Sequence, residues 1–330
     1  MAKKRRESSL ISFQQRFGTE QSCIEYLASI RWPKGYKCNK CGSPKAYQLK
    51  VQPRVFQCSS CRFQESVTAG TVLHRTKLPL VKWFWAVYLM SQDRRGVSAA
   101  HVARELGLHY STAWTLLHKL RRSLASQGEH LLQGVVEVDE TYYGGKGSSD
   151  SGGRSLNNDN KILIVMAIER KLAPPNRLPG VKGSGFVAGN AKAALITSAC
   201  AQSLSSFLKD NVATGANIIT DGWAGYNSSG ESFEHEAVTL GKPKNAGEFL
   251  PLVHLQFNNF KSWVKGTFHG VSKKYMPAYL DEWNYRFNRR SLISNLFQFV
   301  VRRITNSAPI TYKDIGNGPP LMKPLHGLSR

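Results

Sequence analysis

Four of the six cysteines form the pattern that most constrains the fold. They are two Cys-x2-Cys pairs separated by sixteen residues: Cys38, Cys41, Cys58 and Cys61. Each pair presents two thiolates from a tight turn, and four thiolates at this spacing close a tetrahedron around Zn²⁺. Two disulfides would use the same cysteines, but a cytoplasmic protein keeps its thiols reduced. We therefore expect a zinc ribbon that depends on its metal, because so small a fold has little apolar core.

The other two cysteines have a different expected role. Cys23 and Cys200 have no partner at ligand spacing. A free cysteine behaves as a small apolar side chain and is among the most often buried residue types. We expect both to be buried.

Positive charge is concentrated at both ends of the chain. The formal net charge is +23, of which residues 1–130 carry +15, residues 131–250 carry −1 and residues 251–330 carry +9. Basic flanks around a neutral centre suit a protein that grips a polyanion with its ends and keeps acidic residues in its middle for another purpose. Nucleic acid is the polyanion that we expect. A generally basic surface that serves only solubility is the alternative.

The apolar period becomes helical between Leu78 and Leu124. A helix that is apolar nearly all round comes first and should be buried. A helix that ends at Gly107 and another that begins with Ser111 or Thr112 as N-cap then form a helix-turn-helix, whose second helix would enter a major groove. Helical hairpins that bind nothing share this periodicity, so the basic flank is what favours DNA. The candidates for base contacts are Tyr110, Ser111, Thr112 and Thr115, and those for phosphate contacts are Lys119, Arg121 and Arg122.

The pattern from Gly134 onward is that of a mixed α/β fold. Three strand-like segments precede a helix and a fourth strand, and three helical segments follow. The strands are "GVVEVDETYYGG", "KILIVMAIER", "GSGFVAGNAK" and "ANIITDGWAGYN". A Gly/Ser/Asn-rich excursion, which we expect to be mobile, separates the first two. The order is compatible with a ribonuclease H-like sheet. The fold class is therefore α/β: a ribonuclease H-like mixed sheet with an N-terminal zinc ribbon and a helix-turn-helix segment.

Two of these strands end in an aspartate, Asp139 and Asp221. Adjacent strands of one sheet would place both carboxylates side by side, where they repel each other unless a divalent cation neutralises them. Mg²⁺ or Mn²⁺ held there would activate a water or a 3′-hydroxyl on one side of a phosphodiester and stabilise the leaving oxygen on the other. Glu137 and Glu140 lie close by, but strand alternation turns Glu140 to the other face. A purely structural role stays open, because Asp221 and the following glycine also make a good turn.

Four segments are distinctive when taken together: "VEVDETYYGGK", "IITDGWAGY", "FKSWVKGTFHGVS" and "YLDEWNYRFNRR". They resemble the zinc-ribbon transposases of bacterial insertion sequences, the ISXO-like group of the DDE superfamily, and the resemblance runs from the ribbon to about Arg290. It implies that Asp139 ends the first strand of a ribonuclease H-like sheet and that Asp221 follows the fourth. It also implies a DNA transposase that binds the terminal inverted repeats of its element, cleaves at the ends and joins the 3′-hydroxyl to target DNA. Such an enzyme acts as a multimer that brings two ends together.

The resemblance implies a third catalytic residue, Glu, Asn or His, on a helix seven positions before a lysine. Lys261 is that lysine by its context, and His254 lies seven positions before it, on the same helical face. Imidazole is an unusual ligand for Mg²⁺ and a better one for Mn²⁺, and it can serve as a base instead. Lys261 is expected to contact a DNA phosphate. The rivals to His254 are Asn258, which has the same spacing to Lys265, and also Asn259 and Glu248.

Four segments are expected along the chain: helix and zinc ribbon in residues 1–75, helix-turn-helix in 76–130, catalytic domain in 131–305 and basic tail in 306–330. We found neither an apolar run that could cross a membrane nor a signal peptide, so we expect a cytoplasmic, nucleoid-associated protein. Two other functions remain open: a catalytically inactive, transposase-derived DNA-binding regulator, and a nuclease that cuts without joining. Whether the ribbon contacts DNA or another subunit is open as well.

Overall fold

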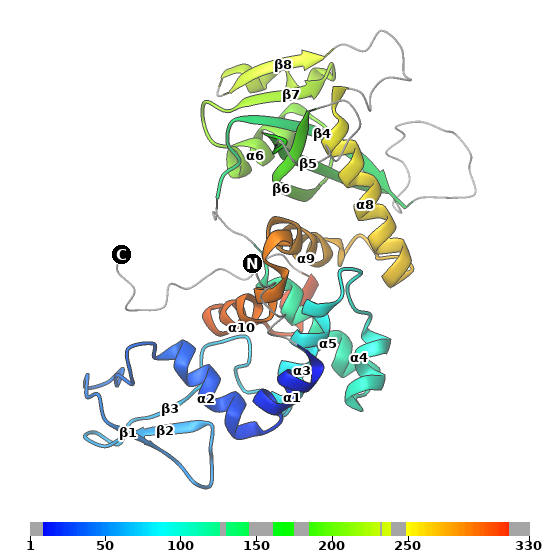
Figure 1. Ribbon diagram of the computed structural model, residues 1–330. Helices are drawn as coiled ribbons and strands as arrows, with labels where there is room; N and C mark the ends of the chain where they lie inside the picture. Colours follow the sequence, from blue (N-terminus) through cyan, green and yellow to red (C-terminus); the bar gives the residue numbers. More distant parts are fainter. Residues whose placement is uncertain are drawn as a thin grey trace. The chain divides into compact units, whose positions relative to one another are not determined.

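A computed structural model gives the fold of the protein (Figure 1). It describes residues 9–125, 130–144, 161–174, 185–231, 233–238 and 249–316. The chain divides into two compact units, Met1–Ala125 with Ser291–Arg330, and Ser126–Arg290. The predicted catalytic domain extends to residue 305, whereas this division groups residues 291–305 with the N-terminal helices. The Gly/Ser/Asn-rich excursion, Glu248 and most of the predicted basic tail lie outside the described residues.

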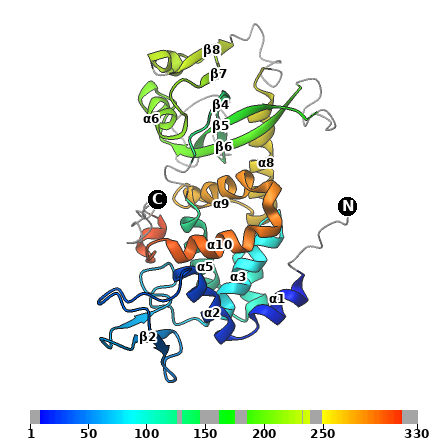
Figure 2. The ribbon, with the colours of Figure 1, turned by 60° about the vertical axis from the view of Figure 1, so that its left-hand side comes forward.

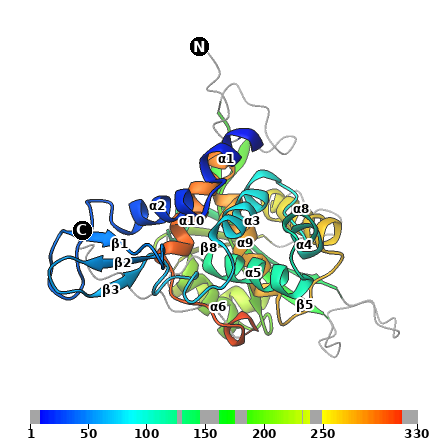
Figure 3. The ribbon, with the colours of Figure 1, turned by 90° about the horizontal axis from the view of Figure 1, so that it is seen from below.

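A small antiparallel sheet forms the ribbon. Its strands are β1 (Ala46–Gln48), β2 (Val55–Cys58) and β3 (Gln64–Ser66), and β2 lies in the middle (Figure 3). Val55 pairs with Ser66 and Cys58 pairs with Ala46, so the strand that carries the third cysteine is hydrogen-bonded on both sides. The sequence predicts β1 and β2 but not β3, because β3 is short and polar and pairs only through its backbone.

Helices make up the rest of the N-terminal unit. They are α1 (Leu10–Phe17), α2 (Glu20–Arg31), α3 (Leu80–Gln92), α4 (Ala99–Leu106), α5 (Tyr110–Ser123) and α10 (Leu296–Asn306), with a 3-10 turn at Lys313–Gly316. Thr19 caps α2 and so separates it from α1. The aromatic rings of Phe17 and Phe84 meet that of Phe297 from α10. In addition, Arg303 Nε donates to the Ser123 carbonyl at 2.8 Å. These contacts explain why α10 belongs with the N-terminal helices.

The predicted helix-turn-helix is confirmed as α4 and α5. Helix α4 ends at Leu106, and the C-cap Gly107 has a φ of 56°, in the left-handed region that glycine adopts without strain. Helix α5 begins at Tyr110, so the prediction of Ser111 or Thr112 as its N-cap is wrong. His109 is the N-cap, and its Nδ1 accepts a hydrogen bond from the Ser111 backbone N–H at 3.3 Å. An imidazole nitrogen therefore does what a hydroxyl was expected to do.

The second unit is built on a five-stranded sheet. Its strands are β4 (Val135–Tyr143), β5 (Ile162–Leu172), β6 (Phe186–Ile196), β7 (Asn217–Asp221) and β8 (Glu234–Val238), in the spatial order β6-β5-β4-β7-β8. The first three strands along the chain pair antiparallel, whereas β7 is parallel to β4 and β8 is parallel to β7. This order confirms the predicted ribonuclease H-like mixed sheet. The sequence does not predict β8, because "EHEAV" lacks an apolar pattern.

Helices cover both faces of this sheet. Helix α6 (Ala201–Asn211) lies on one face, and α8 (Pro251–Phe268) and α9 (Met276–Asn288) lie on the other (Figure 2). Successive residues of a strand point to opposite faces, so β5 buries Ile164 and Met166 against α8 and α9, and Leu163 and Val165 against α6. A short 3-10 segment at Ala224–Glu231 completes the unit, and another at Arg290–Asn295 begins at its last residue and leads into the other unit. Within the described residues, none of the helices combines the length and apolar character that a membrane crossing requires.

Candidate active site

Two neighbouring parallel strands bring the predicted aspartates together. In the register of β4 and β7, Glu137 pairs with Ile219, so Asp139 and Asp221 each lie two residues further along, at the same end of the sheet. One carboxylate oxygen of each lies within 4.8 Å of the other. The prediction that adjacent strands place these carboxylates side by side is therefore confirmed. The parallel pairing and its register, which local sequence does not specify, decide this proximity.

A third carboxylate, that of Glu140, completes the group. One oxygen each of Asp139, Glu140 and Asp221 lie within 4.8 Å of one another. As strand alternation predicts, the side chain of Glu140 turns toward the α6 side, where the Tyr226 hydroxyl donates to Glu140 Oε2 at 3.0 Å. The opposite direction of the side chain does not separate Glu140 from the aspartates, because alternation fixes the direction of a side chain and not the reach of its carboxylate. In the sequence, the adjacent acids of "VDE" are the signal that could have indicated this third carboxylate.

The carboxylates of Asp139, Glu140 and Asp221, here called the carboxylate group, bring like charges close together. Burial, with further contributions from Asp139 and Asp221, raises the pKa of Glu140 to about 7. Burial and the same carboxylates also raise the pKa of Tyr226 well above its usual value, so its hydroxyl stays a donor. Adjacent carboxylates at a partly buried site are what a divalent cation neutralises, and all-oxygen ligands suit Mg²⁺ and Mn²⁺. The residues present therefore fit such an ion.

Helix α8 brings His254 and Lys261 to strand β4. His254 Nε2 lies 3.4 Å from Asp139 Oδ2, and Lys261 Nζ donates to Thr141 Oγ1 at 2.6 Å. Burial lowers the pKa of His254, Lys261 lowers it further, and Glu137 and Asp221 partly oppose this, so the imidazole is neutral at neutral pH. Burial also lowers the pKa of Lys261. The rival residues Asn258, Asn259 and Lys265 are all exposed. Asn258 and Lys265 lie one helical turn after His254 and Lys261 on the same face of α8, whereas Asn259 points away from it.

The start of α8 is held by a carboxylate from β4. Glu137 is fully buried, and its Oε2 accepts from the backbone N–H groups of Leu252 and Val253 at 2.9 and 3.0 Å. Its Oε1 accepts from Arg170 Nε at 2.7 Å. Leu250, at the N-cap position, has no side-chain acceptor to offer, so Glu137 serves as the cap from another element. His254 follows directly after the two bonded amides, which makes Glu137 a positioning residue for it.

The four ribbon cysteines form a second candidate metal site. Their sulfur atoms lie within 4.8 Å of one another, with Cys38 to Cys61 and Cys41 to Cys58 each at 3.6 Å. All six cysteines of the chain are free, which excludes the disulfide alternative in this structure. The backbone N–H of Cys61 lowers the pKa of the Cys58 thiol to about 6. The four sulfur atoms, close together and free of disulfides, fit the tetrahedral thiolate site that Zn²⁺ prefers.

The structure divides the DNA-binding candidates of α5. Tyr110, Ser111 and Thr112 are exposed, and Thr115 and Lys119 are half-buried. Two phosphate candidates require a correction: Arg121 and Arg122 are only 1% and 2% exposed, and Arg121 Nη2 donates to the Val97 carbonyl at 3.2 Å. The last turn of α5 is buried in the helical unit, so these guanidinium groups do not reach a phosphate in this conformation.

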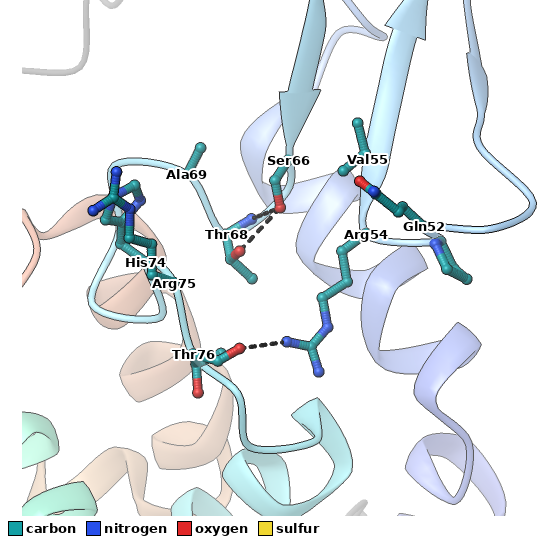
Figure 4. Close-up of a pocket in the computed structure, with 10 residues that line it drawn as sticks. Gln52, Arg54, Val55, Ser66, Thr68, Ala69, His74, Arg75 and Thr76 are labelled. Carbon is teal, nitrogen blue, oxygen red and sulfur yellow. Dashed lines mark hydrogen bonds between the residues drawn. The ribbon is translucent and has the colours of Figure 1, made fainter.

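A cavity of about 430 Å³ in the N-terminal unit lies beside the ribbon (Figure 4). Arg54 lines it, but the guanidinium of Arg54 is already engaged. Its Nη1 donates to the Thr76 carbonyl at 3.0 Å, and its Nε donates to Glu20 Oε1 at 2.9 Å. Glu20 Oε2 in turn accepts from the backbone N–H of Leu80, at the start of α3, at 2.7 Å. Arg54 therefore ties the ribbon to α2 and α3, which is a structural role.

Comparisons with known proteins agree with this geometry. Residues 131–288 match the family model of the ISXO2-like transposase domain, and residues 18–64 match that of the transposase zinc-ribbon domain. The first range contains the carboxylate group, His254 and Lys261, and the second contains the four ribbon cysteines. The chain is also 24% identical over 277 residues to an uncharacterized protein in transposable element ISH50 of Halobacterium salinarum, covering 82% of this chain and 91% of that protein. The chain therefore combines a transposase zinc-ribbon domain in residues 18–64 with an ISXO2-like transposase domain in residues 131–288.

Proposed function

We propose that this protein is a transposase that binds the terminal inverted repeats of its element, cleaves at the ends and joins the freed 3′-hydroxyl to target DNA by metal-dependent phosphoryl transfer. The observation that carries the proposal is the convergence of three carboxylates within 4.8 Å, two from the middle of β4 and one from the end of β7. They lie inside the ISXO2-like transposase domain. DNA strand cleavage and joining both need a site that stabilises charge on attacking and leaving oxygens, and such a carboxylate group holds the cations that do so.

The carboxylates of Asp139 and Asp221 are the proposed ligands of Mg²⁺ or Mn²⁺, and Glu140 joins them. The cation, when bound, supplies Lewis-acid activation of a water or a 3′-hydroxyl. His254 is the proposed third catalytic residue of the family pattern. Its neutral Nε2, 3.4 Å from Asp139, is placed either to take a proton from the attacking hydroxyl or to act as a ligand. Lys261, on the same face of α8, offers a point charge to a DNA phosphate.

The N-terminal unit is the proposed DNA-binding part. Its basic charge attracts the polyanion, and the exposed start of α5 presents Tyr110, Ser111 and Thr112 for base contacts in a major groove. Thr115 and Lys119 lie further along the same helix. We propose Zn²⁺ in the ribbon, which contacts either DNA or another subunit, and a homo-oligomer that brings two ends together. A protein with these partners associates with the nucleoid.

A strand-transfer assay with precut element ends tests the proposal. We expect joining by the wild-type protein in Mg²⁺ or Mn²⁺, and none by Asp139→Ala. His254→Ala should abolish joining while end binding, measured by gel shift, stays intact. Asn258→Ala, at the rival position one helical turn after His254, should join normally, and loss of joining there would assign the third position to Asn258 instead. Cutting without joining would identify a nuclease, and end binding without either reaction would identify an inactive regulator; either outcome refutes the proposal.

A further inference from the structure

A second cavity lies directly beside the carboxylate group. Its volume is about 300 Å³. It is lined by the end of β4, the start of β5 and the segments that follow β6 and β7, through Asp139, Glu140, Tyr142, Leu163, Ser198, Ala199, Cys200 and Trp223. Because Asp139 and Glu140 belong to both the cavity wall and the carboxylate group, a molecule in this cavity adjoins whatever the carboxylates bind.

The cavity lies on the α6 side of the sheet, away from His254 and Lys261. Along β4, Asp139 and Thr141 contact the α8 residues, whereas Glu140 and Tyr142 point to the opposite face. A phosphate at the carboxylate group would therefore have the ammonium of Lys261 on one side. On the other side it would have this cavity, which is flanked by acids. Among the described residues, no lysine or arginine lines it, although Lys161 Nζ lies 5.9 Å from the centroid of the Tyr142 ring.

Trp223 forms a rigid aromatic part of the cavity wall. Its side chain is held by its polar edge, because the indole Nε1 donates to the Ala199 carbonyl at 2.8 Å. Its backbone N–H donates to Asp221 Oδ1 at 3.2 Å, which links it to the carboxylate group. Yet the residue is 38% exposed, which is unusual for so large an apolar side chain. The ring therefore offers apolar surface at a fixed place beside the site.

Gly225 is what allows the indole to lie there. A Cβ at this position would be 2.7 Å from Trp223 Nε1 and 2.7 Å from the Ala199 carbonyl oxygen. Both distances are shorter than van der Waals contact, and one of the two atoms belongs to the backbone. An alanine would thus drive the indole away from the hydrogen bond that fixes it. Trp223→Ala removes the ring, and Gly225→Ala displaces it, so the two variants perturb the same wall by different means.

The chemistry of the lining selects the class of occupant. Tyr142, Leu163 and Trp223 provide apolar and aromatic surface, and Ser198 and Cys200 provide small polar groups. A phosphate at the carboxylate group would be held through the cation, whereas a second phosphate deeper in the cavity would meet the acids with no cationic side chain among the lining residues. A flat, neutral ring with polar edges satisfies both conditions, and nucleobases stack on fixed aromatic side chains in this manner.

We propose that this cavity receives one unpaired base of the element's end, that of the nucleotide next to the phosphate held at the carboxylate group. The proposal rests on the proposed transposase function, which brings a DNA end to these carboxylates. Extruding a terminal base is less costly than extruding an internal one, because an end base pair stacks on one side only. A base held in the cavity would fix the strand and thus the position of its phosphate.

Cys200 provides a direct probe of occupancy. It is exposed, so the prediction that it is buried is wrong, whereas Cys23 is buried as expected. Hydrogen bonds from Ser198 and Ser203 lower the pKa of Cys200 to about 7, which makes its thiolate available to iodoacetamide at pH 7.5. Labelling is followed by peptide mass spectrometry on the full chain with zinc present, and Cys200→Ser identifies the labelled site.

The test compares three DNA duplexes bound to equal extent by gel shift: the element's end, the same end with an abasic site at the proposed nucleotide, and a duplex of unrelated sequence. We expect the intact end to slow the labelling of Cys200 at least tenfold, and the other two duplexes to leave it nearly unchanged. Trp223→Ala and Gly225→Ala should lose most of this protection, and Trp223→Phe, which keeps an aromatic ring but loses the hydrogen bond to the Ala199 carbonyl, should retain more of it than either.

Equal protection by the intact and the abasic end would overturn the proposal, as would no protection by a bound end. Strand transfer measured on the same preparations separates this failure from that of the proposed function. A protein that joins ends without protecting Cys200 has the proposed activity but not the base-binding cavity. A protein that binds no element end refutes both proposals.

Discussion

Replacing Glu137 should loosen the start of α8 and separate His254 from Asp139. The Glu137 carboxylate accepts two backbone N–H groups at the start of that helix and the Arg170 guanidinium, and all three bonds are 3.0 Å or shorter. In Glu137→Gln the side chain keeps its shape and one acceptor oxygen, but it loses the charge that favours the helix N-terminus. The NH2 of the new amide must then point either at the Arg170 guanidinium or at the two backbone N–H groups. In both cases one donor faces another.

The structure sets the size of the effect. Removing one partner of a buried ion pair costs about 3–5 kcal/mol, and an orphaned buried N–H group costs about 1–3 kcal/mol. These costs overlap, because they describe the same carboxylate. Arg170 is 17% exposed and gains some hydration. We therefore expect Glu137→Ala to lower the free energy of unfolding by about 3–4 kcal/mol, and the isosteric Glu137→Gln by about 2 kcal/mol.

Hydrogen exchange and urea unfolding measure the two consequences separately. In Glu137→Gln, the amides of Leu252 and Val253 should exchange about thirtyfold faster, which corresponds to a local loss of about 2 kcal/mol. Strand transfer by Glu137→Gln should also fall when it is measured without urea, where the variant is fully folded.

The matched control is Glu169→Gln. Glu169 is 5% exposed and accepts from two backbone N–H groups, those of Gln133 and Asn190, which are remote from α8 in the chain. It should cost similar stability while it leaves the exchange at the start of α8 and the strand transfer nearly unchanged. Unaltered exchange at Leu252 and Val253 in Glu137→Gln would refute the reasoning, and so would an equal loss of strand transfer in both variants.

Three further predictions concern the N-terminal unit. Zinc chelation or Cys58→Ser should release one bound metal per chain and lower the unfolding temperature of the ribbon, as atomic absorption and calorimetry would show; an unchanged transition after metal loss would contradict this. Burial, reinforced by a neighbouring arginine, lowers the pKa of His118 to about 3 from the ordinary 6.5. Between pH 6.5 and about 3, the unfolded chain binds a proton at His118 that the folded chain does not bind. The free energy of unfolding should therefore fall as the pH is lowered through this range, by up to about 1.4 kcal/mol per pH unit. His118→Phe should flatten that slope between pH 5 and 6.5, and equal slopes would exclude this cause. Arg54→Met, which breaks the bond to Glu20, should cost about 1–3 kcal/mol in urea unfolding, whereas the exposed Lys45→Met should cost almost nothing; equal effects would contradict the structural role of Arg54.

Local patterns in the sequence determine much of this protein. Two Cys-x2-Cys pairs are enough to predict the ribbon, because each knuckle turn is a local structure and the metal imposes the rest. Helical periodicity with a glycine after Leu106 predicts α4 and α5, and runs of β-branched residues predict the main strands. Two apolar strands that each run into an aspartate are enough to predict a pair of carboxylates, because neighbouring parallel strands bring equivalent positions together. The prediction that the first strand ends at Asp139 is wrong, since β4 continues to Tyr143.

Other features depend on contacts between segments far apart in the chain. The sequence alone does not show that Glu140 joins the carboxylate group, that Glu137 caps α8 or that Arg121 is buried. Strand β8 also escapes prediction, because it exists only through its pairing with β7. Charge and periodicity describe what a side chain prefers, whereas burial and hydrogen-bond partners are set by the elements that pack against it. The aspartate pair was therefore readable from the sequence, and the third carboxylate and the anchored helix beside it were decided by the tertiary structure.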